Sequence, residues 1–412
     1  MESVKHSIYL EVFWLLHHSP TLPWCEKALI SPGQYHSCPS KEDFTIRMKE
    51  LEVPLNMATP PVSLKTLPAS SLMRGPMGNL MPVYGLISIK GLSVNMNARW
   101  FVKEDFCRPD IFGGIPLHFF AVYDGHGSSQ VSSLCKDLLH IIVAEELVCI
   151  RYMGSSSTGA VRVNGNTSSS ARGSHQQVVD ENIWEGHIQR ALRNSFDRMD
   201  QEAIGPCYCN GTSNICRCRP TLRNFSGSAA NVVILALHHI IIANCGNSRV
   251  VLCRAGKAIP LSNDHKPDRP DELERIYAAG GKLIERDGLK VNGILNMTRA
   301  IGDYYLKEVI ISKPEVTITE RDVDDEFLIL ASDGLWSVLS DARACEMVSS
   351  CLKDESPATA PGYHNPGHSV TDGTEAMFPT KNALAASILA RFALARGSQD
   401  NISVIVVDLS RR

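Results

Sequence analysis

The chain has 412 residues, of which 44% are hydrophobic and 21% charged, the composition of a globular protein with a large core. Its 41 basic and 44 acidic residues nearly cancel to a net charge of −3, so a protein specialised for binding nucleic acid is disfavoured. No apolar run reaches the roughly 18 residues that cross a bilayer, and the opening run at 8–16 lacks a cleavage site, so we predict no signal peptide. The 13 cysteines are odd in number and spread through apolar runs, which predicts reduced thiols in an intracellular protein.

Changes in periodicity and composition along the sequence predict one domain preceded by an N-terminal extension. Residues 1–83 have weak periodicity and many prolines, so we expect a poorly ordered N-terminal extension. Residues 84–410 are expected to form a single domain, with flexible insertions near 154–175 and 354–380, where Gly, Ser, Thr and Pro are frequent.

Within that domain the predicted strands outnumber the helices. Helices are expected from their 3.6-residue apolar spacing and end signals at 128–148, 180–203, 271–279, 341–353 and 381–395. Strands are expected at 117–123, 231–237, 239–244, 249–254, 315–319, 326–331 and 401–409. Because most neighbouring strands are joined by short connections and the helices are grouped apart, the pattern favours an α+β sandwich of antiparallel sheets.

Three aspartates share one arrangement. Asp124 follows an apolar run and precedes Gly125, Asp333 follows another and precedes a glycine, and Asp400 precedes the last strand. Each stands where a rigid strand meets a turn, so the three carboxylates can point into one cleft. Oxygen ligands without an accompanying Cys/His pattern are typical of Mg²⁺ or Mn²⁺ sites, whereas a single Asp-Gly is more often a turn cap.

The segments around these aspartates resemble a known family. The motifs are YDGHG at 123–127, CGNSRVVL at 245–252, NDHKPDRPDE at 263–272, AAGG at 278–281, VNGILNMTRAIGD at 291–303, LILASDGLW at 328–336 and SQDNISVIVVD at 398–408. In order and spacing they resemble the PPM/PP2C metal-dependent serine/threonine protein phosphatases over residues 84–409. The segments at 263–272 and 278–281 look most like the plant group that serves as abscisic acid co-receptors.

The resemblance implies a fold, a cofactor and a catalytic group. The fold would be the PP2C-type β-sandwich, two antiparallel sheets flanked by helices. Asp124 would bridge two Mn²⁺ or Mg²⁺ ions, the Gly125 carbonyl would bind one of them, and Asp333 and Asp400 would hold the other. His126 would be the general acid that protonates the leaving seryl or threonyl oxygen; the alternative is a structural histidine.

Further positions are implied at the edge of the site. Asp303 would be an outer carboxylate beside the metals, with a turn cap as the alternative, and Arg299 would lie nearby in a supporting or substrate-side position. The segment from Arg286 to Gly293 would contact substrate. Arg286 stands where a tryptophan of the co-receptor group inserts into the hormone receptor, and a charged side chain cannot supply that aromatic anchor. We therefore expect abscisic acid receptors to bind weakly, as in the branch of the group that lacks this tryptophan.

Three positions depart from the family at the start of the domain. Ser93 stands where an arginine binds the substrate phosphate, Asn97 where a glutamate binds the second metal, and Ala98 where an aspartate follows. The pair Glu104-Asp105 is an alternative source of the missing acidic metal ligand, but the residues that follow it disfavour this alignment.

Four more departures would weaken a peripheral third metal site or its surroundings. They are Asn247 and Ser337, where aspartates are common, Ala229, where threonine is usual, and Thr298, where serine is usual. Two explanations compete for all of the departures. The protein is a weakened or inactive phosphatase that still binds partners, or the residues before about 100 reflect a faulty gene model, which would not account for Asn247, Ser337 and Ala229.

One cysteine cluster has the composition of a metal site. Its four members occur as two CxC pairs, which suit either a structural Zn²⁺ site or redox-sensitive thiols. The cluster comprises Cys207, Cys209, Cys216 and Cys218.

The expected function is dephosphorylation of phosphoproteins, with protein kinases of the abscisic acid pathway as partners, negative regulation of that signalling, and placement in nucleus and cytoplasm. The alternative is a catalytically impaired binding module for kinases or regulators. We expect a monomer that binds neither nucleic acid nor membrane.

Overall fold

The computed structural model describes residues 81–150, 173–205, 225–286, 288–354 and 380–410, with the side chains of the second range described from residue 183. The predicted extension at 1–83 and the two predicted insertions lie almost entirely outside these residues. The division into extension, domain and insertions therefore stays a prediction.

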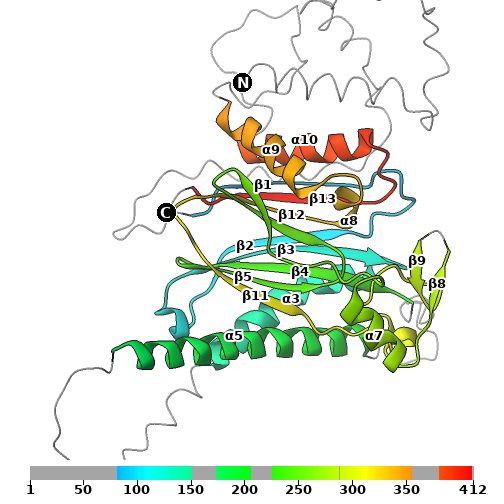
Figure 1. Cartoon of the computed structure of the whole chain (residues 1–412), viewed down its shortest axis with the longest axis horizontal. Coiled ribbons are helices and arrows are strands. Elements are labelled where there is room, and N and C mark those ends of the chain that lie inside the picture. The colour runs from blue at the N-terminus through cyan, green and yellow to red at the C-terminus, as the bar shows by residue number, and fades with distance from the viewer. Residues whose placement is uncertain (1–80, 151–172, 206–224, 287, 355–379, 411–412) are drawn as a thin grey trace, which may run out of the picture.

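Two antiparallel sheets face each other across the middle of the domain (Figure 1). The first has the order β1-β13-β12-β6-β7, with bounds Tyr84–Ile89, Ile402–Asp408, Asp325–Ala331, Arg249–Arg254 and Lys257–Pro260. The second has the order β11-β5-β4-β3-β2, with bounds Glu315–Glu320, His239–Cys245, Gly227–Leu235, Leu117–His126 and Arg99–Cys107. The two-residue strand β10 (Ile301–Gly302) pairs with β4.

Helices cover the outer face of each sheet (Figure 1). The second sheet is covered by α3 (Gln130–Cys149) and α5 (Gly173–Ile204), and the first by α8 (Asp333–Trp336), α9 (Asp341–Lys353) and α10 (Lys381–Ala395). At one end lie α7 (Pro270–Ala278) and the hairpin of β8 (Leu283–Glu285) and β9 (Leu289–Val291). Short 3₁₀ turns occupy Asp110–Phe112 and Tyr304–Leu306.

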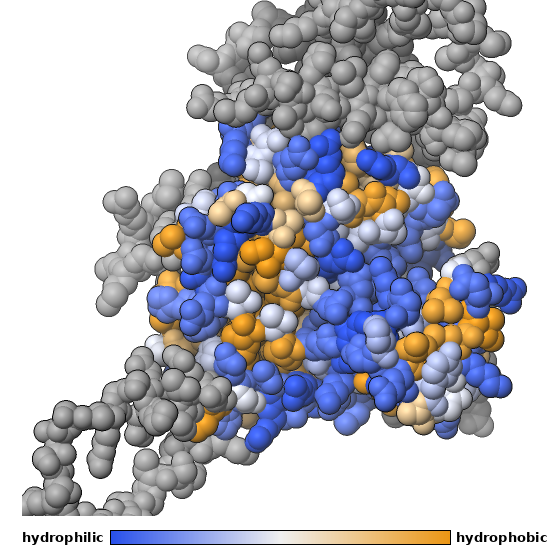
Figure 2. Space-filling model, in the orientation of Figure 1, coloured by the Kyte–Doolittle hydropathy of each residue, from blue (hydrophilic) through white to orange (hydrophobic). Residues whose placement is uncertain are grey.

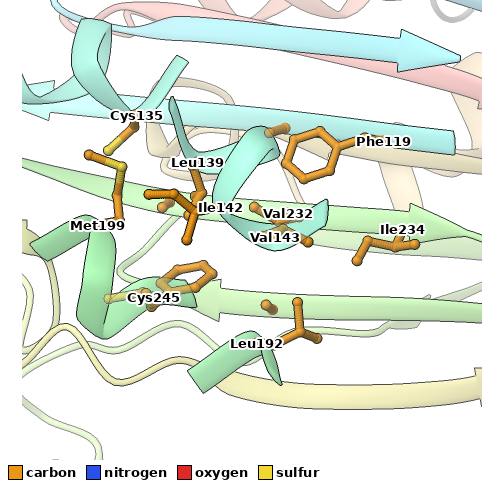
Figure 3. Packing of buried hydrophobic residues seen from close by; sticks show 14 of the residues in the cluster. Phe119, Cys135, Leu139, Ile142, Val143, Leu192, Met199, Val232, Ile234 and Cys245 are labelled. Atoms are coloured by element: carbon orange, nitrogen blue, oxygen red, sulfur yellow. The ribbon is translucent and has the colours of Figure 1, made fainter. Parts of the chain in front are cut away.

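The two sheets and the helices on their outer faces form four layers, and the sequence of β3 shows how this arrangement is specified. Phe119, Ala121 and Tyr123 pack with α3 and α5, whereas Phe120 and Val122 point the other way and pack against the first sheet. Alternate side chains of a strand point to opposite faces, so a strand between two apolar layers must be apolar throughout. Figure 3 shows the helix side of this core, where Leu139 and Ile142 of α3 meet Val232 of β4.

The prediction of an antiparallel α+β sandwich is confirmed. The predicted helices at 341–353 and 381–395 coincide with α9 and α10, where Ser340 and Thr380 cap the first turns by accepting hydrogen bonds from Arg343 N and Ala383 N. The sequence did not predict β2, β7 or the β8–β9 hairpin. The strands of that hairpin are only three residues long and bury a single residue between them, so they lack the buried alternation that marks a strand.

The described cysteines carry no disulfide: Cys135, Cys245, Cys253 and Cys345 are buried free thiols, and Cys107, Cys149 and Cys351 are free as well. Among the described helices, none combines the length and the apolar character needed to cross a bilayer.

Candidate active site

The three predicted aspartates converge at one end of the sandwich. Asp124 ends the buried part of β3 and is 7% exposed. Asp333 opens α8 directly after β12, and Asp400 lies just before β13. The strands β12 and β13 are hydrogen-bonded neighbours, so the residues that flank their paired ends are brought side by side. The structure thus brings together carboxylates that are 276 positions apart between the first and the last (400 minus 124).

These carboxylates are close enough to disturb one another. Burial raises the pKa of Asp124 well above its ordinary value, and the charges of Asp333 and Asp400 raise it further. Burial and the charge of Asp400 also raise the pKa of Asp333, against hydrogen bonds from Asp124 and Asn247. Packed carboxylates of this kind repel one another unless a proton or a cation lies between them. A divalent cation held between these carboxylates would relieve the repulsion.

The unpaired oxygens of the cluster suit a divalent cation. Asp333 Oδ1 is buried and has no hydrogen-bond partner among the described residues. No three His, Cys, Asp or Glu side chains of the described ranges surround one point as a complete ligand set. The donors are nevertheless hard oxygens that share excess negative charge, the chemistry that Mn²⁺ and Mg²⁺ prefer. Residues Asp124, Asp333 and Asp400 therefore fit such an ion by donor type and by electrostatics.

His126 and Asp303 form a close pair beside the cluster. His126 Nε2 lies 2.9 and 2.8 Å from the two carboxylate oxygens of Asp303. Asp303 is 3% exposed, and His126 Nδ1 is buried without a partner in the described part of the chain. Gly227 faces the pair, and a Cβ there would collide with both side chains, so only glycine permits this contact. A carboxylate in this position orients the imidazole ring.

The turn that presents Asp303 is held from two sides. Asp303 has a left-handed backbone with φ of 52°, which is uncommon for a residue other than glycine, and its N–H donates to Ser226 O at 2.9 Å. On the other side, Asp200 of α5 accepts from Gly302 N at 2.8 Å and from Lys307 Nζ at 2.6 Å. The strained backbone persists because these contacts fix it, a feature that recurs at functional sites.

Asn97 lies beside the metal-binding candidates. Its carbonyl accepts a 2.5 Å hydrogen bond from Ser132 Oγ, and a Cβ on Gly125 would lie 2.7 Å from that carbonyl. The register that pairs Arg99 with Tyr123 places Asn97 opposite Gly125 when it is continued by two residues. The alignment that put Asn97 at the position of the missing glutamate is therefore consistent with its place in the fold.

The loop that carries Ser93 and Asn97 is fixed by the side chain of Asn401. Its Oδ1 accepts from the N–H of Asn97 at 2.7 Å and from that of Ala98 at 3.1 Å. Its Nδ2 donates to Lys90 O at 2.8 Å and to Asn95 O at 2.9 Å. Asn401 is 1% exposed and follows Asp400 directly, so one residue ties this loop to a carboxylate of the cluster.

Asn247 and Ala229 are also in the site. Asn247 Nδ2 donates to Asp333 Oδ2 at 2.7 Å, and Ala229 is paired with Asp124 across β4 and β3. An amide at 247 neutralises part of the carboxylate charge without adding to it, unlike the aspartate common in the family. Ser337 is exposed at the end of α8 and makes no side-chain contact with these residues that we observe.

The structure rules out Glu104-Asp105 as a substitute for the missing acid. Asp105 pairs with Arg108 at 2.5 Å, and its N–H donates to His118 Nδ1. Lys103 is opposite Phe119, so this end of β2 is five residues along β3 from Asp124. At about 3.3 Å per residue the separation is roughly 16 Å, too far for a shared metal site.

Arg299 is held in a buried ion-pair network. Its guanidinium donates from Nε at 3.0 Å and from a terminal nitrogen at 2.5 Å to Glu272 Oε1, and to Lys313 O at 3.0 Å. Arg275 and Thr298 bind the other oxygen of Glu272 at 2.8 and 2.6 Å. Arg299 is 9% exposed and held by these contacts, so it supports the fold near the site.

Arg286 and Gly293 lie on the β8–β9 hairpin and the turn that follows it. Arg286 is exposed, and its N–H donates to Gly288 O at 3.0 Å, while Gly293 adopts a left-handed φ of 71°. Figure 1 shows the hairpin projecting from the end of the molecule toward which β3 runs, and Figure 2 shows a hydrophobic area on that side. The exposed Ile284 and Ile294 contribute apolar surface there. A substrate-contact role for the hairpin stays a prediction.

Sequence reasoning missed three supporting residues. Asn401, Asp200 and Ser132 are polar and almost fully buried, and each holds backbone of the site. Asn401 had a signal, since it follows Asp400 within a motif, but Asp200 and Ser132 sit on helices without any local pattern. The cluster of Cys207, Cys209, Cys216 and Cys218 lies outside the described residues, so its zinc or thiol character stays a prediction.

The strand ends of the two-sheet sandwich gather three carboxylates beside a His–Asp pair, a set of oxygen donors suited to divalent metal ions. The chain matches the family model described as protein phosphatase 2C over residues 152–402. It is 46% identical over 328 residues to Probable protein phosphatase 2C 75 of Arabidopsis thaliana, covering 80% of this chain and 73% of that protein. It is 41% identical over 350 residues to Probable protein phosphatase 2C 49 of Oryza sativa subsp. japonica, covering 80% and 78%.

The fold agrees with a solved structure. A serine-threonine phosphatase 2C from Toxoplasma gondii superposes with a TM-score of 0.56 at 20% sequence identity, covering 81% of this chain and 96% of that one. The chain belongs to the protein phosphatase 2C family and is by class a protein phosphatase, and the two relatives named above are plant proteins.

Proposed function

We propose that this chain is a Mn²⁺- or Mg²⁺-dependent serine/threonine phosphatase that dephosphorylates protein kinases and opposes abscisic acid signalling. The observation that supports catalysis is the proximity of Asp124, Asp333 and Asp400 at strand ends, next to the His126–Asp303 pair. The assignment to abscisic acid signalling rests on the motif resemblance at 263–272 and 278–281.

Each group would have a distinct role in hydrolysis. Asp124, the Gly125 carbonyl, Asp333 and Asp400 would hold the divalent ions, whose chemistry is to lower the pKa of a water molecule and to neutralise phosphate charge. His126 would protonate the leaving oxygen of serine or threonine, with Asp303 orienting the ring. The burial of Asp124 strengthens the electrostatic interactions of its carboxylate.

The decisive experiment is Mn²⁺-dependent hydrolysis of a phosphothreonine peptide by the full chain and by Asp333→Ala. We expect the substitution to reduce turnover by at least about a hundredfold, because it removes a carboxylate that would hold the metal. Asp324→Asn, an exposed carboxylate in the loop before β12, is the matched control. Equal rates for the full chain and Asp333→Ala would contradict a catalytic role.

A second candidate is a binding module with little or no turnover. The observation that favours it is Asn97, an amide opposite Gly125 where the family places a second-metal carboxylate. Ser93, in the same loop, lacks the planar bidentate donors with which arginine holds a phosphate.

The double variant Ser93→Arg and Asn97→Glu separates the two candidates. Because Asn401 fixes the backbone of this loop, we expect the new side chains to reach the family positions, with tighter Mn²⁺ binding and about tenfold or greater gain in turnover. Calorimetric Mn²⁺ titration and peptide hydrolysis measure the two effects. Unchanged Mn²⁺ affinity in the double variant would count against a lost second metal site.

The partners and the location are part of this proposal. Receptor with abscisic acid should inhibit the protein weakly, since the exposed Arg286 stands where the receptor-binding tryptophan is found in the co-receptor group. Strong inhibition of the purified protein would contradict this. A fluorescent fusion should distribute between nucleus and cytoplasm, and light scattering on the purified chain should report a monomer.

A further inference from the structure

A cavity of about 610 Å³ opens between the edges of the two sheets, and its lining residues do not include the carboxylate cluster. Its walls come from the start of β6, the loop between β7 and α7, the start of α9 and the edge strand β11. This volume lies within the about 300–1,000 Å³ typical of ligand sites. Its lining is Asn244, Arg249, Pro260, Leu261, Ser262, Asn263, Asp264, Lys266, Asp268, Arg269, Glu315, Thr317 and Asp341.

The basic groups of the cavity are already neutralised. Arg249 donates to both oxygens of Asp264 at 2.9 and 2.8 Å and to Asp341 at 2.6 Å. These hydrogen bonds raise the pKa of Arg249, against the effect of its burial. Lys266 Nζ lies 3.1 Å from Asp264. These two cations are thus held by carboxylates that line the same cavity.

Arg269 is held in the same way. It makes two hydrogen bonds to Asp271, at 2.7 and 2.6 Å, and also pairs with Glu315. Despite its burial, the pKa of Glu315 falls to about 2 through its hydrogen bonds with His265 and Arg269, so Glu315 is negatively charged at neutral pH. A phosphate or another anion would find no uncommitted cation among the lining residues.

In contrast, some hydrogen-bond acceptors that line the cavity have no partner within the described ranges. Asp268 is exposed and has no hydrogen bond or ion pair within the described ranges. Asn244 is 1% exposed, and its Nδ2 donates to Gly246 O and Asn263 O at 3.4 and 3.1 Å. These carbonyls fix the amide orientation, which leaves Asn244 Oδ1 buried without a partner. With four lining carboxylates against three bases, the cavity favours a cationic donor.

The cavity is connected to the candidate active site. Asn247, two residues before Arg249, hydrogen-bonds Asp333, and the Arg249 guanidinium lies 5.5 Å from the centre of the Trp336 ring in α8. Two residues of chain span at most about 7 Å, so an extended peptide bound at Asp333 can also reach the cavity wall at Arg249. The neighbouring strand β11 is the edge of its sheet, along which an extended peptide can lie.

We propose that this cavity binds an arginine or lysine side chain of the phosphoprotein substrate, a few residues from the phosphorylated residue. Asp268 accepts the charged hydrogen bonds of that side chain, and the paired carboxylates around it supply the negative potential. This inference rests on the proposed phosphatase function and specifies its substrate class as phosphoproteins with a nearby basic residue.

The test uses two phosphothreonine peptides, one with arginine four residues before and after the phosphothreonine, and one with glutamine at both places. The arginine peptide should have a KM about three- to fivefold lower, at an unchanged kcat, as expected for a partly exposed ion pair. Asp268→Asn should abolish this difference, whereas Asp324→Asn, an exposed carboxylate outside the cavity, should preserve it.

Fluorescence anisotropy of the labelled peptides, on the same proteins, makes the result independent of turnover. A preference for the arginine peptide that Asp268→Asn removes would support the cavity even if no hydrolysis occurred, in which case only the phosphatase proposal would fail. Equal affinities for the two peptides, or a preference that survives Asp268→Asn, would overturn the cavity proposal.

Discussion

Glu272 illustrates how a single buried carboxylate organises the surroundings of the site. It is 1% exposed on α7 and accepts hydrogen bonds from Arg299, Arg275 and Thr298. Burial alone would raise its pKa, but these three donors outweigh that effect and hold the pKa at about 2. The residue therefore remains charged in the core, where an unpaired charge would be strongly destabilising.

Glu272→Gln should lower the free energy of unfolding by about 2–4 kcal/mol, because the amide leaves Arg299 and Arg275 partly uncompensated. Urea unfolding at pH 7 measures the change. Glu274→Gln, an exposed position on the same helix, should leave the midpoint almost unchanged. Similar midpoints for the two variants would show that the network contributes little.

The same variant predicts a pH dependence. A carboxyl whose folded pKa is depressed stabilises the protein fully above its unfolded value of about 4.5, and the stabilisation is lost as the pH falls toward about 2. The stability difference between wild type and Glu272→Gln should therefore be constant from pH 7 to 5 and shrink below about 4.5. Urea midpoints across this range test it, and a difference that grew on acidification would have the wrong sign.

Asp303→Asn should act on proton transfer to the leaving group. We expect kcat for a phosphothreonine peptide to fall about ten- to a hundredfold, since the amide cannot orient His126 for proton transfer as the carboxylate does. An aryl phosphate, whose leaving group needs little protonation, should lose much less activity. If both substrates slowed equally, Asp303 would be acting through structure or metal binding instead.

At the scale of elements, the strands that carry the site could be located from the sequence more securely than the segments that complete it. The runs at 117–123 and 326–331 are apolar on both faces and end at aspartates, so β3 and β12 were predictable together with the positions of Asp124 and Asp333. The loop at 90–98 has no such pattern, because its conformation depends on Asn401, which is more than 300 residues away.

Asn401→Ala should release that loop. The loss of four hydrogen bonds to backbone groups should cost about 2–4 kcal/mol and accelerate hydrogen exchange at the Asn97 and Ala98 amides, with weaker Mn²⁺ binding as a consequence. Asn382→Ala is the matched control, since Asn382 is 3% exposed but its amide nitrogen has no partner among the described residues. Unchanged hydrogen exchange at the Asn97 and Ala98 amides in Asn401→Ala would show that Asn401 does not hold this loop in place.

At the scale of the whole molecule, the two sheets are held together by one shared apolar layer. Leu330 of β12, Phe120 and Val122 of β3 and Ile405 of β13 are all fully buried in this layer. Since β3, β12 and β13 also present the carboxylates, any slip of one sheet against the other would separate Asp124 from Asp333 and Asp400. Stability and the geometry of the site therefore depend on the same core.

Leu330→Ala should cost about 3–5 kcal/mol, because a cavity between two rigid sheets cannot collapse easily. Thermal unfolding measures the loss, and Val323→Ala, whose side chain is 82% exposed, should have almost no effect. A small loss in Leu330→Ala would indicate that the sheets can approach each other to fill the space.

By itself, the sequence determined the sandwich, most of its strands and helices, and the candidate residues Asp124, His126, Asp333 and Asp400. The sandwich and the three aspartates rest on apolar periodicity and local turn signals, which are properties of neighbouring residues, whereas the role of His126 is implied by the motif resemblance. Only the tertiary structure decided that Asp303 pairs with His126, that Arg299 is committed to Glu272, that Glu104-Asp105 lies away from the site and that a charged cavity adjoins it. Contacts between side chains from distant segments follow from the packing of the sheets and helices, which no local pattern encodes.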